Sequence, residues 1–376
     1  MLRDARVATI VLNYRHTEDT VACLTALQRS TCLDQRFVVV DNAAPGPEHD
    51  ALRAAVTAAT APAADVAVVA SGGNLGYAAG NNLGIRLALG LGSPAGPAGS
   101  AAPAAGPDRT PERPRRPEFV LIVNPDLHVE PTTVERLLAA ARAVPDAAAI
   151  GPRIVFGEAD GTVPRDGRAR IWFDGGVFDR SRAGATTHLN MGRTEGEVPP
   201  GPPRDVDYVT GACLLLRADA LRTVGLLPED YFLYFEETDY CQQLVAAGWR
   251  LVVDSRARAV HHKRSSGSLP TPAYTYYMRR NKQLFARRMG LDEAAAIEEF
   301  RQVWIDPWRR NVGNRAPHWQ PTFDALIARA EADAAAGVTG PVDLSAYPSA
   351  AETAATQAAP ADDIPAETDE LQEEHA

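Results

Sequence analysis

The chain has 376 residues, 45% of them hydrophobic and 23% charged, which is typical of a soluble globular protein with one large or two modest domains. It contains no run of about eighteen apolar residues, and the stretch MLRDARVATIVLNY lacks a signal-peptide cleavage site, so we expect a cytoplasmic protein. The net charge of −10 comes from eleven acidic residues after Arg329, and the remaining residues carry +1. The basic surplus of a nucleic-acid binder is absent, so we expect no nucleic-acid partner.

Short β-branched, apolar runs alternate with helical patterns along the first part of the chain. The runs predict strands at residues 7–12, 37–40, 66–70 and 119–123. Helical spacing of apolar residues predicts helices at residues 17–29, 51–60 and 132–144. A Gly/Asn-rich loop after the third strand leads into a further helix. This alternation is typical of a parallel, doubly wound sheet.

The second part of the chain has a less regular pattern. Residues 150–206 predict hairpins or a mobile loop, and residues 206–216 predict a strand or a strand pair. A helix at residues 239–247 should end at Gly248, the common left-handed terminator. The remaining predicted elements are a helix at 218–224, a strand at 251–253, and helices at 274–288, 293–303 and 323–335.

Composition divides the chain into three parts. Residues 1–270 are predicted to form an α/β domain, residues 271–338 a C-terminal helical extension, and residues 339–376 a disordered acidic tail. Within the α/β domain, residues 90–117 are almost wholly Gly, Ala, Pro and Ser followed by basic residues, which predicts a disordered insertion.

Polar residues follow four of the predicted strands, at the edge where open α/β sheets bind their ligands. They are Asn13, the pair Asp41 and Asn42, residues 71–74, and residues 124–126. Asn, Asp and Gly also form turns, and for any single position that is the simpler interpretation. Four such groups on one edge favour a binding site.

An aromatic and acidic cluster at residues 231–237 is followed by a helix, a short apolar run and two histidines, His261 and His262. Aromatic walls desolvate a carboxylate and raise its pKa toward the range in which a general base works. The histidines stand where a strand should end, which is a common place for ligand-binding side chains.

Together these stretches resemble the family-2 glycosyltransferases with a GT-A fold, especially the branch with rhamnosyl- and galactofuranosyltransferases of bacterial cell-surface glycans. The resemblance covers about residues 7–288. It is carried, in chain order, by IVLNY (10–14), VVVDNA (38–43), NLGYAAGNN (74–82), NPD (124–126), GACLLLR (211–217), YFLYFEETDY (231–240) and AVHH (259–262).

The resemblance implies a GT-A fold, a mixed sheet flanked by helices. It also implies an inverting, metal-dependent glycosyltransferase of cell-surface polysaccharide or glycoconjugate biosynthesis. The donor would be a nucleotide-diphosphate sugar, dTDP-rhamnose or a UDP-sugar, and the acceptor a hydroxyl of a glycan, a lipid-linked glycan or another small molecule. Because acceptors in this family are often lipid-linked, peripheral contact with the inner face of the membrane is a hypothesis.

The same resemblance implies a divalent cation, Mn²⁺ or Mg²⁺, held by Asp126 and His261. Asn124-Pro125-Asp126 looks like a shortened Asp-x-Asp motif, so one carboxylate is lost at Asn124. Such cations commonly take one or two carboxylates, with phosphate oxygens completing the shell, and imidazole suits Mn²⁺ better than Mg²⁺. His262 is the alternative ligand, because adjacent side chains on a strand point to opposite faces.

Glu237 stands where the family has its usual general base, the second acid of Glu-Asp-x-Asp. Glu in place of Asp keeps the acid and lengthens its reach by one methylene. Glu236 and Asp239 are the alternative bases, although Asp239 could instead cap the following helix.

By resemblance, Asn13, Asp41 and Asn42 face the nucleobase and ribose. The donor site further includes Asn74, Gly76, Asn81 and Asn124. Glycine lets the backbone approach a nucleotide closely, and the following helix N-terminus favours anions. The loop is neither a Walker A motif nor a GxGxxG motif, and a plain glycine-rich turn is the alternative.

For two further sets of residues, the sequence allows two interpretations each. Trp172 and Asp174 in WFDGG form either a sugar-stacking surface or an ordinary hairpin. The basic residues contact a diphosphate or a phosphorylated lipid acceptor, or they form a solvated helix face, which we favour; they are Lys263, Arg264, Arg279, Arg280 and Lys282.

Two other functions are alternatives to sugar transfer. A binding-only relative would hold a nucleotide sugar without transferring it. A nucleotidyltransferase should have a Gly-rich loop with a basic residue after the first strand, which the segment after Tyr14 lacks.

Overall fold

The computed structural model describes residues 7–32, 34–61, 64–92, 116–157, 167–262 and 269–358. Most of the predicted insertion at 90–117 falls on residues 93–115, and part of the predicted tail on residues 359–376. Both stretches lie outside the described residues, as do Lys263 and Arg264.

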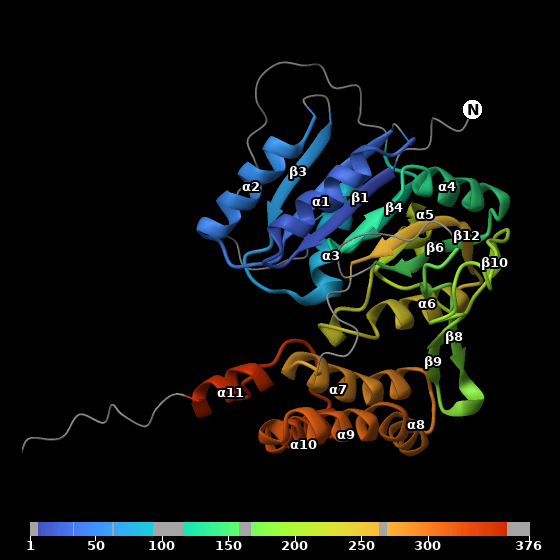
Figure 1. The fold of residues 1–376 in the computed structure, drawn as a ribbon. Helices are drawn as coiled ribbons and strands as arrows, with labels where there is room; N and C mark the ends of the chain where they lie inside the picture. The colour runs from blue at the N-terminus through green and yellow to red at the C-terminus, as the bar shows by residue number, and fades with distance from the viewer. Residues whose placement is uncertain are drawn as a thin grey trace, which may run out of the picture.

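A mixed sheet of ten strands forms the centre of the protein (Figure 1). Its main path is β10 (Arg204–Asp205), β12 (Arg250–His261), β6 (Ala147–Phe156), β11 (Cys213–Arg217), β4 (Phe119–Val123), β1 (Val7–Asn13), β2 (Gln35–Asp41) and β3 (Asp65–Ala70). The two remaining strands pair at the side, β5 (Leu127–Val129) with β12 and β7 (Ile171–Phe173) with β6.

The direction of the strands changes across the sheet. β3, β2, β1 and β4 are parallel, as the alternation of strands and helices predicts. β11 runs antiparallel between β4 and β6. β6 and β12 are parallel to each other and run in the same direction as β4, whereas β10 is antiparallel to β12. The expectation of a wholly parallel sheet is therefore wrong, and the sheet is mixed, as the resemblance to a GT-A fold implies.

Helices flank this sheet and form a second layer beneath it (Figure 1). Those of the sheet domain are α1 (Thr17–Gln28), α2 (Pro47–Ala59), α3 (Gly76–Leu89), α4 (Thr133–Ala143), α5 (Ala218–Thr223) and α6 (Glu236–Ala246). Those that follow are α7 (Pro272–Arg288), α8 (Glu293–Phe300), α9 (Asp306–Arg315), α10 (Gln320–Ala335) and α11 (Ala350–Ala358). A separate hairpin, β8 (Gly176–Asp179) and β9 (Ala185–His188), reaches from the sheet toward α8.

The core of the sheet follows from its continuous apolar strands. All five residues of β4, FVLIV, are buried, and β6 is buried until its last residue. Strands covered on both faces need apolar side chains at every position, which explains why these runs do not alternate with polar residues.

Two boundaries differ from the sequence prediction in ways that matter for the site. β12 runs from Arg250 to His261, far beyond the predicted residues 251–253, because the arginines and Asp254 that interrupt its apolar pattern form ion pairs. α6 begins at Glu236 rather than at residue 239, so both glutamates belong to its first turn.

The layer of α7, α8, α9 and α10, called here the helical layer, has a hydrophobic core of its own (Figure 1). Residues of the preceding segment 231–235, the aromatic turn, belong to this second core: Tyr231, Phe232 and Phe235 pack with Phe285 and its neighbours. The aromatic side chains therefore join the end of the sheet domain to the helical layer.

Residues 339–358 differ from the predicted disordered tail. Val342, Leu344 and Tyr347 pack against the core of the helical layer. The backbone N–H of Val342 donates to the Tyr277 hydroxyl at 3.0 Å, and the Trp319 indole N–H donates to the carbonyl of residue 348 at 2.7 Å. The prediction missed these contacts because three apolar side chains are dispersed in an Ala- and Pro-rich composition.

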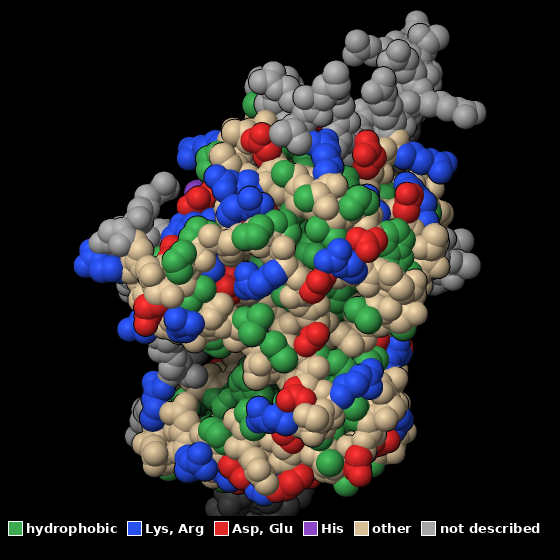
Figure 2. All heavy atoms as spheres, turned by 90° about the vertical axis from the view of Figure 1, so that its right-hand side faces the viewer, with side chains coloured by type: hydrophobic (Ala, Val, Ile, Leu, Met, Phe, Trp, Pro, Cys, Tyr) green, Lys and Arg blue, Asp and Glu red, His purple; other side chains and the backbone are tan. Residues whose placement is uncertain are grey.

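One face of the molecule carries Lys and Arg side chains among Asp and Glu side chains, without one large basic patch (Figure 2). This mixture agrees with the near-neutral charge of the chain before its tail. Among the described residues, no helix combines the length and apolar character that crossing a membrane requires.

Candidate active site

The ends of β1, β2 and β4 meet at one edge of the sheet. There the N–H of Asn42 donates to the Asn13 carbonyl at 2.7 Å, and the N–H of Asn124 donates to the Ala212 carbonyl at 2.9 Å. His261, the last residue of β12, pairs with Leu127 just after β4. The topology thus brings together four of the stretches that the sequence singles out.

Asp126 and His261 are in direct contact at this edge. His261 Nε2 lies 2.8 Å from Asp126 Oδ2, although 135 residues separate them in the chain. Burial by itself would raise the pKa of the Asp126 carboxyl, but the hydrogen bond and charge of His261 and the nearby His16 together lower it. Asp126 is therefore ionised at neutral pH.

These two side chains fit a divalent cation in number and in spacing. Asp126 Oδ1 and His261 Nδ1 are buried without a hydrogen-bond partner. Two adjacent ligands of an octahedral ion, each about 2.1 Å from the metal, lie about 3 Å apart, close to the separation observed here. No cluster of three or more metal-binding side chains occurs in the described parts of the chain. A cation held by this pair would take its other ligands from phosphate oxygens or water.

The neighbours of His261 distinguish it from His262. The Trp172 ring meets His261 edge-on with centroids 4.7 Å apart, whereas the His262 ring lies 6.3 Å from that of His128. The two histidines therefore face different groups, as expected at a strand end. Trp172 is half-buried and packs beside the Asp126 and His261 pair.

Glu237 lies in the first turn of α6 and is half-buried. Burial raises the pKa of its carboxyl group, and backbone N–H groups, including those of Gly211 and Thr238, partly oppose this. Gly211 precedes Ala212, whose carbonyl binds Asn124. Glu237 is thereby connected through Gly211 and Ala212 to Asn124, two residues before Asp126.

Glu236 has a different environment from its neighbour. It is only 3% exposed, and its Oε2 has no hydrogen-bond partner. Burial and the charge of Glu237 raise the pKa of Glu236 well above its usual range. The raised pKa disfavours the ionised form of Glu236, which favours Glu237 of the two as a base.

Asp239 does not have the free carboxylate that a base needs. It is 1% exposed and accepts hydrogen bonds from the Tyr231 hydroxyl at 2.7 Å and from Gln243 at 2.8 Å. Arg288 contacts it at 2.6 Å. The proposal of Asp239 as an alternative base is thus not supported by its position, because its oxygens are already bound.

The aromatic turn that precedes these glutamates has an unusual backbone. Phe232, Tyr234 and Phe235 have φ angles of 68°, 70° and 77°. Phe232, with ψ of −56°, has the dihedral angles of a rare γ-turn. A left-handed conformation costs a bulky residue about 1–3 kcal/mol, and such strain gathers at functional sites.

A cavity of about 360 Å³ opens beside Asn13 and Asp41. Asn13 donates to Asp41 Oδ1 at 3.2 Å, and His49 Nδ1 lies 2.8 Å from Asp41 Oδ2. The Asn13 Oδ1 also accepts from the Thr20 hydroxyl at 2.9 Å. The volume is within the range of small-ligand pockets, and contact of Asn13 and Asp41 with a nucleotide stays a prediction.

Other predicted donor residues are engaged in the protein itself. The Asn42 amide donates to Asn74 Oδ1 at 3.2 Å and to the Gly76 carbonyl at 3.1 Å. A side chain at Gly76 would meet the Phe232 carbonyl at 2.3 Å, so this glycine admits the aromatic turn rather than a nucleotide. Asn81 is fully buried and donates to the Tyr77 carbonyl. Asn42, Gly76 and Asn81 therefore stabilise the loop through contacts inside the protein, whereas we expected them to contact the donor directly.

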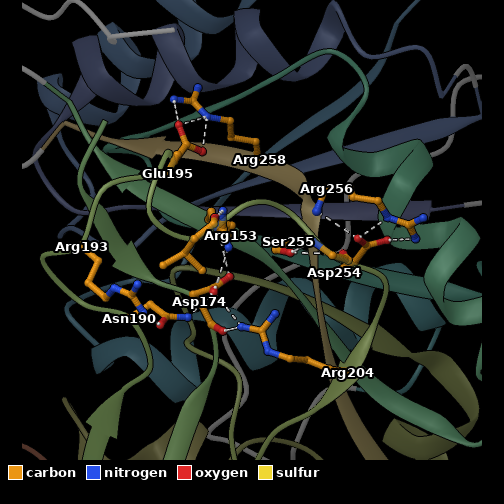
Figure 3. Close-up of polar contacts among 12 residues, drawn as sticks. Arg153, Asp174, Asn190, Arg193, Glu195, Arg204, Asp254, Ser255, Arg256 and Arg258 are labelled. Atoms are coloured by element: carbon orange, nitrogen blue, oxygen red, sulfur yellow. Dashed lines mark hydrogen bonds and ion pairs between the residues drawn. The ribbon is translucent and has the colours of Figure 1, made fainter. Parts of the chain in front are cut away.

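Asp174 is a structural ion-pair residue and not part of a sugar-binding surface. It is fully buried, and Arg153 donates to its two oxygens at 3.0 Å each. Asn190 donates at 2.8 Å, and Arg204 approaches to 2.8 Å (Figure 3). This excludes the sugar-stacking interpretation for Asp174, while Trp172 lies beside His261 and its role stays a prediction.

The basic residues of α7 do not form the solvated face that we expected. Arg279, Arg280 and Lys282 are all buried. Lys282 donates to the Gly184 carbonyl at 2.8 Å, and Arg280 donates to the Tyr231 carbonyl at 2.8 Å. The sequence offers little signal for this arrangement, because the partner carbonyls are about fifty to a hundred residues away in the chain.

Two further residues near Glu237, Tyr77 and Gly211, lie in motifs of the resemblance, but the sequence analysis gave neither of them a role. The Tyr77 hydroxyl donates to the Gly211 carbonyl at 2.6 Å, and a side chain at Gly211 would meet that hydroxyl at 2.5 Å. Burial, followed by the charges of Glu237 and Glu236, raises the pKa of Tyr77 well above its usual value. Tyr77 therefore remains protonated and joins α3 to the turn before β11, whose residue Ala212 binds Asn124.

Comparisons with known proteins point to one class. No protein-family model matches the chain. It is similar to the N-acetylglucosaminyl-diphospho-decaprenol L-rhamnosyltransferase of Mycobacterium tuberculosis, with 32% identity over 208 residues that cover 54% of this chain and 60% of that protein. It is also similar to the low-salt glycan biosynthesis hexosyltransferase Agl10 of Haloferax volcanii, with 24% identity over 74% of this chain and 73% of that one.

Among solved structures, a mannosyltransferase of Pyrobaculum calidifontis in complex with GDP-Man and Mn²⁺ matches with 18% identity and a TM-score of 0.45, over 94% of this chain and 79% of that one. A likeness of this size adds nothing to the assignment. The mixed sheet, with its polar groups at one edge, agrees with the GT-A fold that the sequence resemblance implies. Both curated relatives are glycosyltransferases by name, and the chain spans 60% of the length of the first and 73% of the second.

Proposed function

We propose that the chain transfers a sugar from a nucleotide-diphosphate donor to an acceptor hydroxyl, with inversion at the anomeric carbon. The observation that carries this proposal is the contact of Asp126 with His261 at the sheet edge, and the raised pKa of Glu237, whose backbone partner Gly211 precedes the residue that binds Asn124, supports it. The names of the curated relatives, a rhamnosyltransferase and a hexosyltransferase, support it.

The donor would lie across this edge. Asn13 and Asp41 line the cavity expected to take the nucleobase and ribose. Asp126 and His261 would hold Mn²⁺ or Mg²⁺, which when bound neutralises the charge of the diphosphate leaving group. The donor is dTDP-rhamnose or a UDP-sugar, and the rhamnosyltransferase relative makes dTDP-rhamnose the first to test.

Glu237 would act as the general base. Its carboxylate takes the proton of the acceptor hydroxyl while that oxygen attacks the anomeric carbon, and the bond from this carbon to the diphosphate breaks. Because burial raises the pKa of Glu237 above its usual 4.5, the rate should rise with pH through a value above 4.5. Glu236, whose pKa burial and the charge of Glu237 raise well above its usual range, is not the base in this step.

The Glu237→Gln variant tests this proposal, with Glu298→Gln on α8 as the matched control because Glu298 is exposed and pairs with Arg301. Nucleoside diphosphate release from dTDP-rhamnose and UDP-sugars, with acceptor present, should fall at least about 100-fold in the first variant and stay unchanged in the second. Equal activity in wild type and Glu237→Gln would refute the assignment.

A nucleotide-sugar-binding relative without transfer activity is the alternative. It predicts that the donor raises the melting temperature of wild type while no nucleoside diphosphate is released with any acceptor. Turnover by wild type would exclude it.

The proposed acceptor is a glycan or lipid-linked glycan, and we also propose peripheral contact with the membrane surface. The decaprenol-linked substrate in the name of the mycobacterial relative supports a lipid-linked acceptor. Cosedimentation with anionic liposomes should carry the protein into the pellet. Protein that remains wholly in the supernatant would argue against membrane contact.

A further inference from the structure

The aromatic turn is held by hydrogen bonds to every one of its carbonyl groups. Two of these bonds come from the backbone: the N–H of Tyr77 donates to the Phe232 carbonyl at 2.7 Å, and the N–H of Asp239 donates to the Phe235 carbonyl at 2.8 Å. The other three carbonyls are bound by side chains of α7. A strained segment persists only where its surroundings determine its conformation in this way.

Asn281 supplies most of the contacts from α7. Its amide nitrogen lies 3.0 Å from the Tyr231 carbonyl, 2.6 Å from that of Leu233 and 3.1 Å from that of Tyr234. The side chain is fully buried. One amide group thus gathers three carbonyl oxygens of the turn immediately before Glu236.

Arg280 orients this amide. Its Nε donates to Asn281 Oδ1 at 2.9 Å, which directs the amide nitrogen toward the turn. The guanidinium group also donates to the Tyr231 carbonyl at 2.8 Å and to the Gly340 carbonyl at 2.7 Å, and it lies 4.8 Å from the centre of the Tyr277 ring. The planar, forked guanidinium is suited to three such bonds at once, and a lysine is not.

We propose that Asn281, oriented by Arg280, is a positioning residue that holds the aromatic turn in its strained form and so places the carboxylate of Glu237. The inference rests on the proposed function, because it gives the helical layer a part in catalysis by the sheet domain. Asn281 reaches Glu237 only through the backbone of residues 231–235.

The hydrogen bonds from Asn281 to the aromatic turn explain why the position of Glu237 depends on α7. Phe235, with a left-handed backbone, immediately precedes the first residue of α6. If the three carbonyls lose their donor, the turn can relax, and the first turn of α6 shifts with it. A displacement of about 1 Å of a reacting group costs about 100-fold in rate.

The test compares Asn281→Ala and the milder Arg280→Lys with Arg287→Ala, a control on the same helix whose exposed side chain pairs with Glu293. We expect kcat to fall about 100-fold in Asn281→Ala and less in Arg280→Lys, with the donor KM and the control unchanged. The acidic limb of the pH profile of kcat should move to lower pH, since a more solvated Glu237 has a pKa nearer its ordinary value.

Hydrogen–deuterium exchange gives a readout that needs no activity. Amides of residues 231–239 should exchange at least about tenfold faster in Asn281→Ala than in Arg287→Ala, while those of β1 and β4 should not change. A purely structural role would instead speed exchange throughout the helical layer and leave the pH limb of the residual activity in place, which would overturn the proposal.

The two proposals fail in different ways. If Glu237→Gln abolishes transfer while folded Asn281→Ala retains wild-type kcat and exchange, only the positioning role is wrong. If wild type and Glu237→Gln are equally active, the proposed base is wrong. In that case, and also if wild type transfers no sugar, exchange at residues 231–239 still decides whether Asn281 holds the turn.

Discussion

The buried pair of Asp174 and Arg153 makes a quantitative prediction about stability. In Asp174→Ala, Arg153 keeps its bond to the Val198 carbonyl but loses its partners at Nε and Nη2 inside the protein, where it is 1% exposed. Removing one partner of a buried ion pair costs about 3–5 kcal/mol. We expect a loss of that size in the free energy of unfolding, measured by urea denaturation followed by circular dichroism.

A matched control lies on the neighbouring strand. Asp205 and Arg250 form the same two-bond contact, at 2.8 and 2.9 Å, but both side chains are largely exposed. Asp205→Ala should therefore cost a small fraction of the loss seen in Asp174→Ala, because water screens exposed pairs. Equal losses in the two variants would refute the argument that burial decides the energy of the pair.

The double variant Arg153→Met with Asp174→Leu extends the test. Replacing both charges by apolar groups of similar size removes the unpaired charge, so it should restore most of the lost stability. A double variant as unstable as Asp174→Ala would show that the loss arises from the other contacts of Asp174, to Asn190 and Arg204.

Three further predictions concern the site itself. Gly76→Ala should lower the free energy of unfolding by about 2 kcal/mol, since its φ of 83° and the Phe232 carbonyl exclude a side chain, whereas Gly73→Ala should have no effect. Glu236→Gln should become progressively more stable than wild type as the pH of urea denaturation rises above 4.5, since the raised pKa of Glu236 makes the folded state retain a proton that the unfolded state has released. Asp126→Ala should lose the rise in melting temperature that Mn²⁺ and a nucleoside diphosphate produce together in wild type.

Each of these three has a result that would contradict it. Equal stability of Gly76→Ala and Gly73→Ala would show that the Phe232 carbonyl does not exclude a side chain at residue 76. A stability difference between Glu236→Gln and wild type that does not vary from pH 5 to pH 8 would mean that Glu236 is ionised when folded. An undiminished thermal shift in Asp126→Ala would place the cation elsewhere.

The sequence predicted the sheet edge well because its signals there are local. Apolar runs end at Asn13, Asp41 and Asn124, and each end is also the end of a strand. The resemblance further pointed to the pair of Asp126 and His261, which the structure brings into contact. The roles of these residues stay predictions.

The parts that sequence reasoning missed depend on distant partners. The sequence around Asp174 does not indicate its contact with Arg153, which is 21 residues away in the chain. Asn281 lies among basic residues in a predicted helix, and nothing near it in the sequence indicates its contacts with the aromatic turn. Strand β12 was underestimated because its arginines break the apolar pattern and find carboxylates far along the chain. Local periodicity contains no information about such contacts.

The aromatic turn belongs to the hydrophobic core of the helical layer, while Asn13, Asp41 and Asp126 belong to the sheet. Heat that loosens the helical layer alone would therefore displace Glu237 and leave the sheet edge assembled. On the proposed function, such a protein would still bind the nucleotide sugar after transfer had stopped, so inactivation and loss of binding would occur at different temperatures.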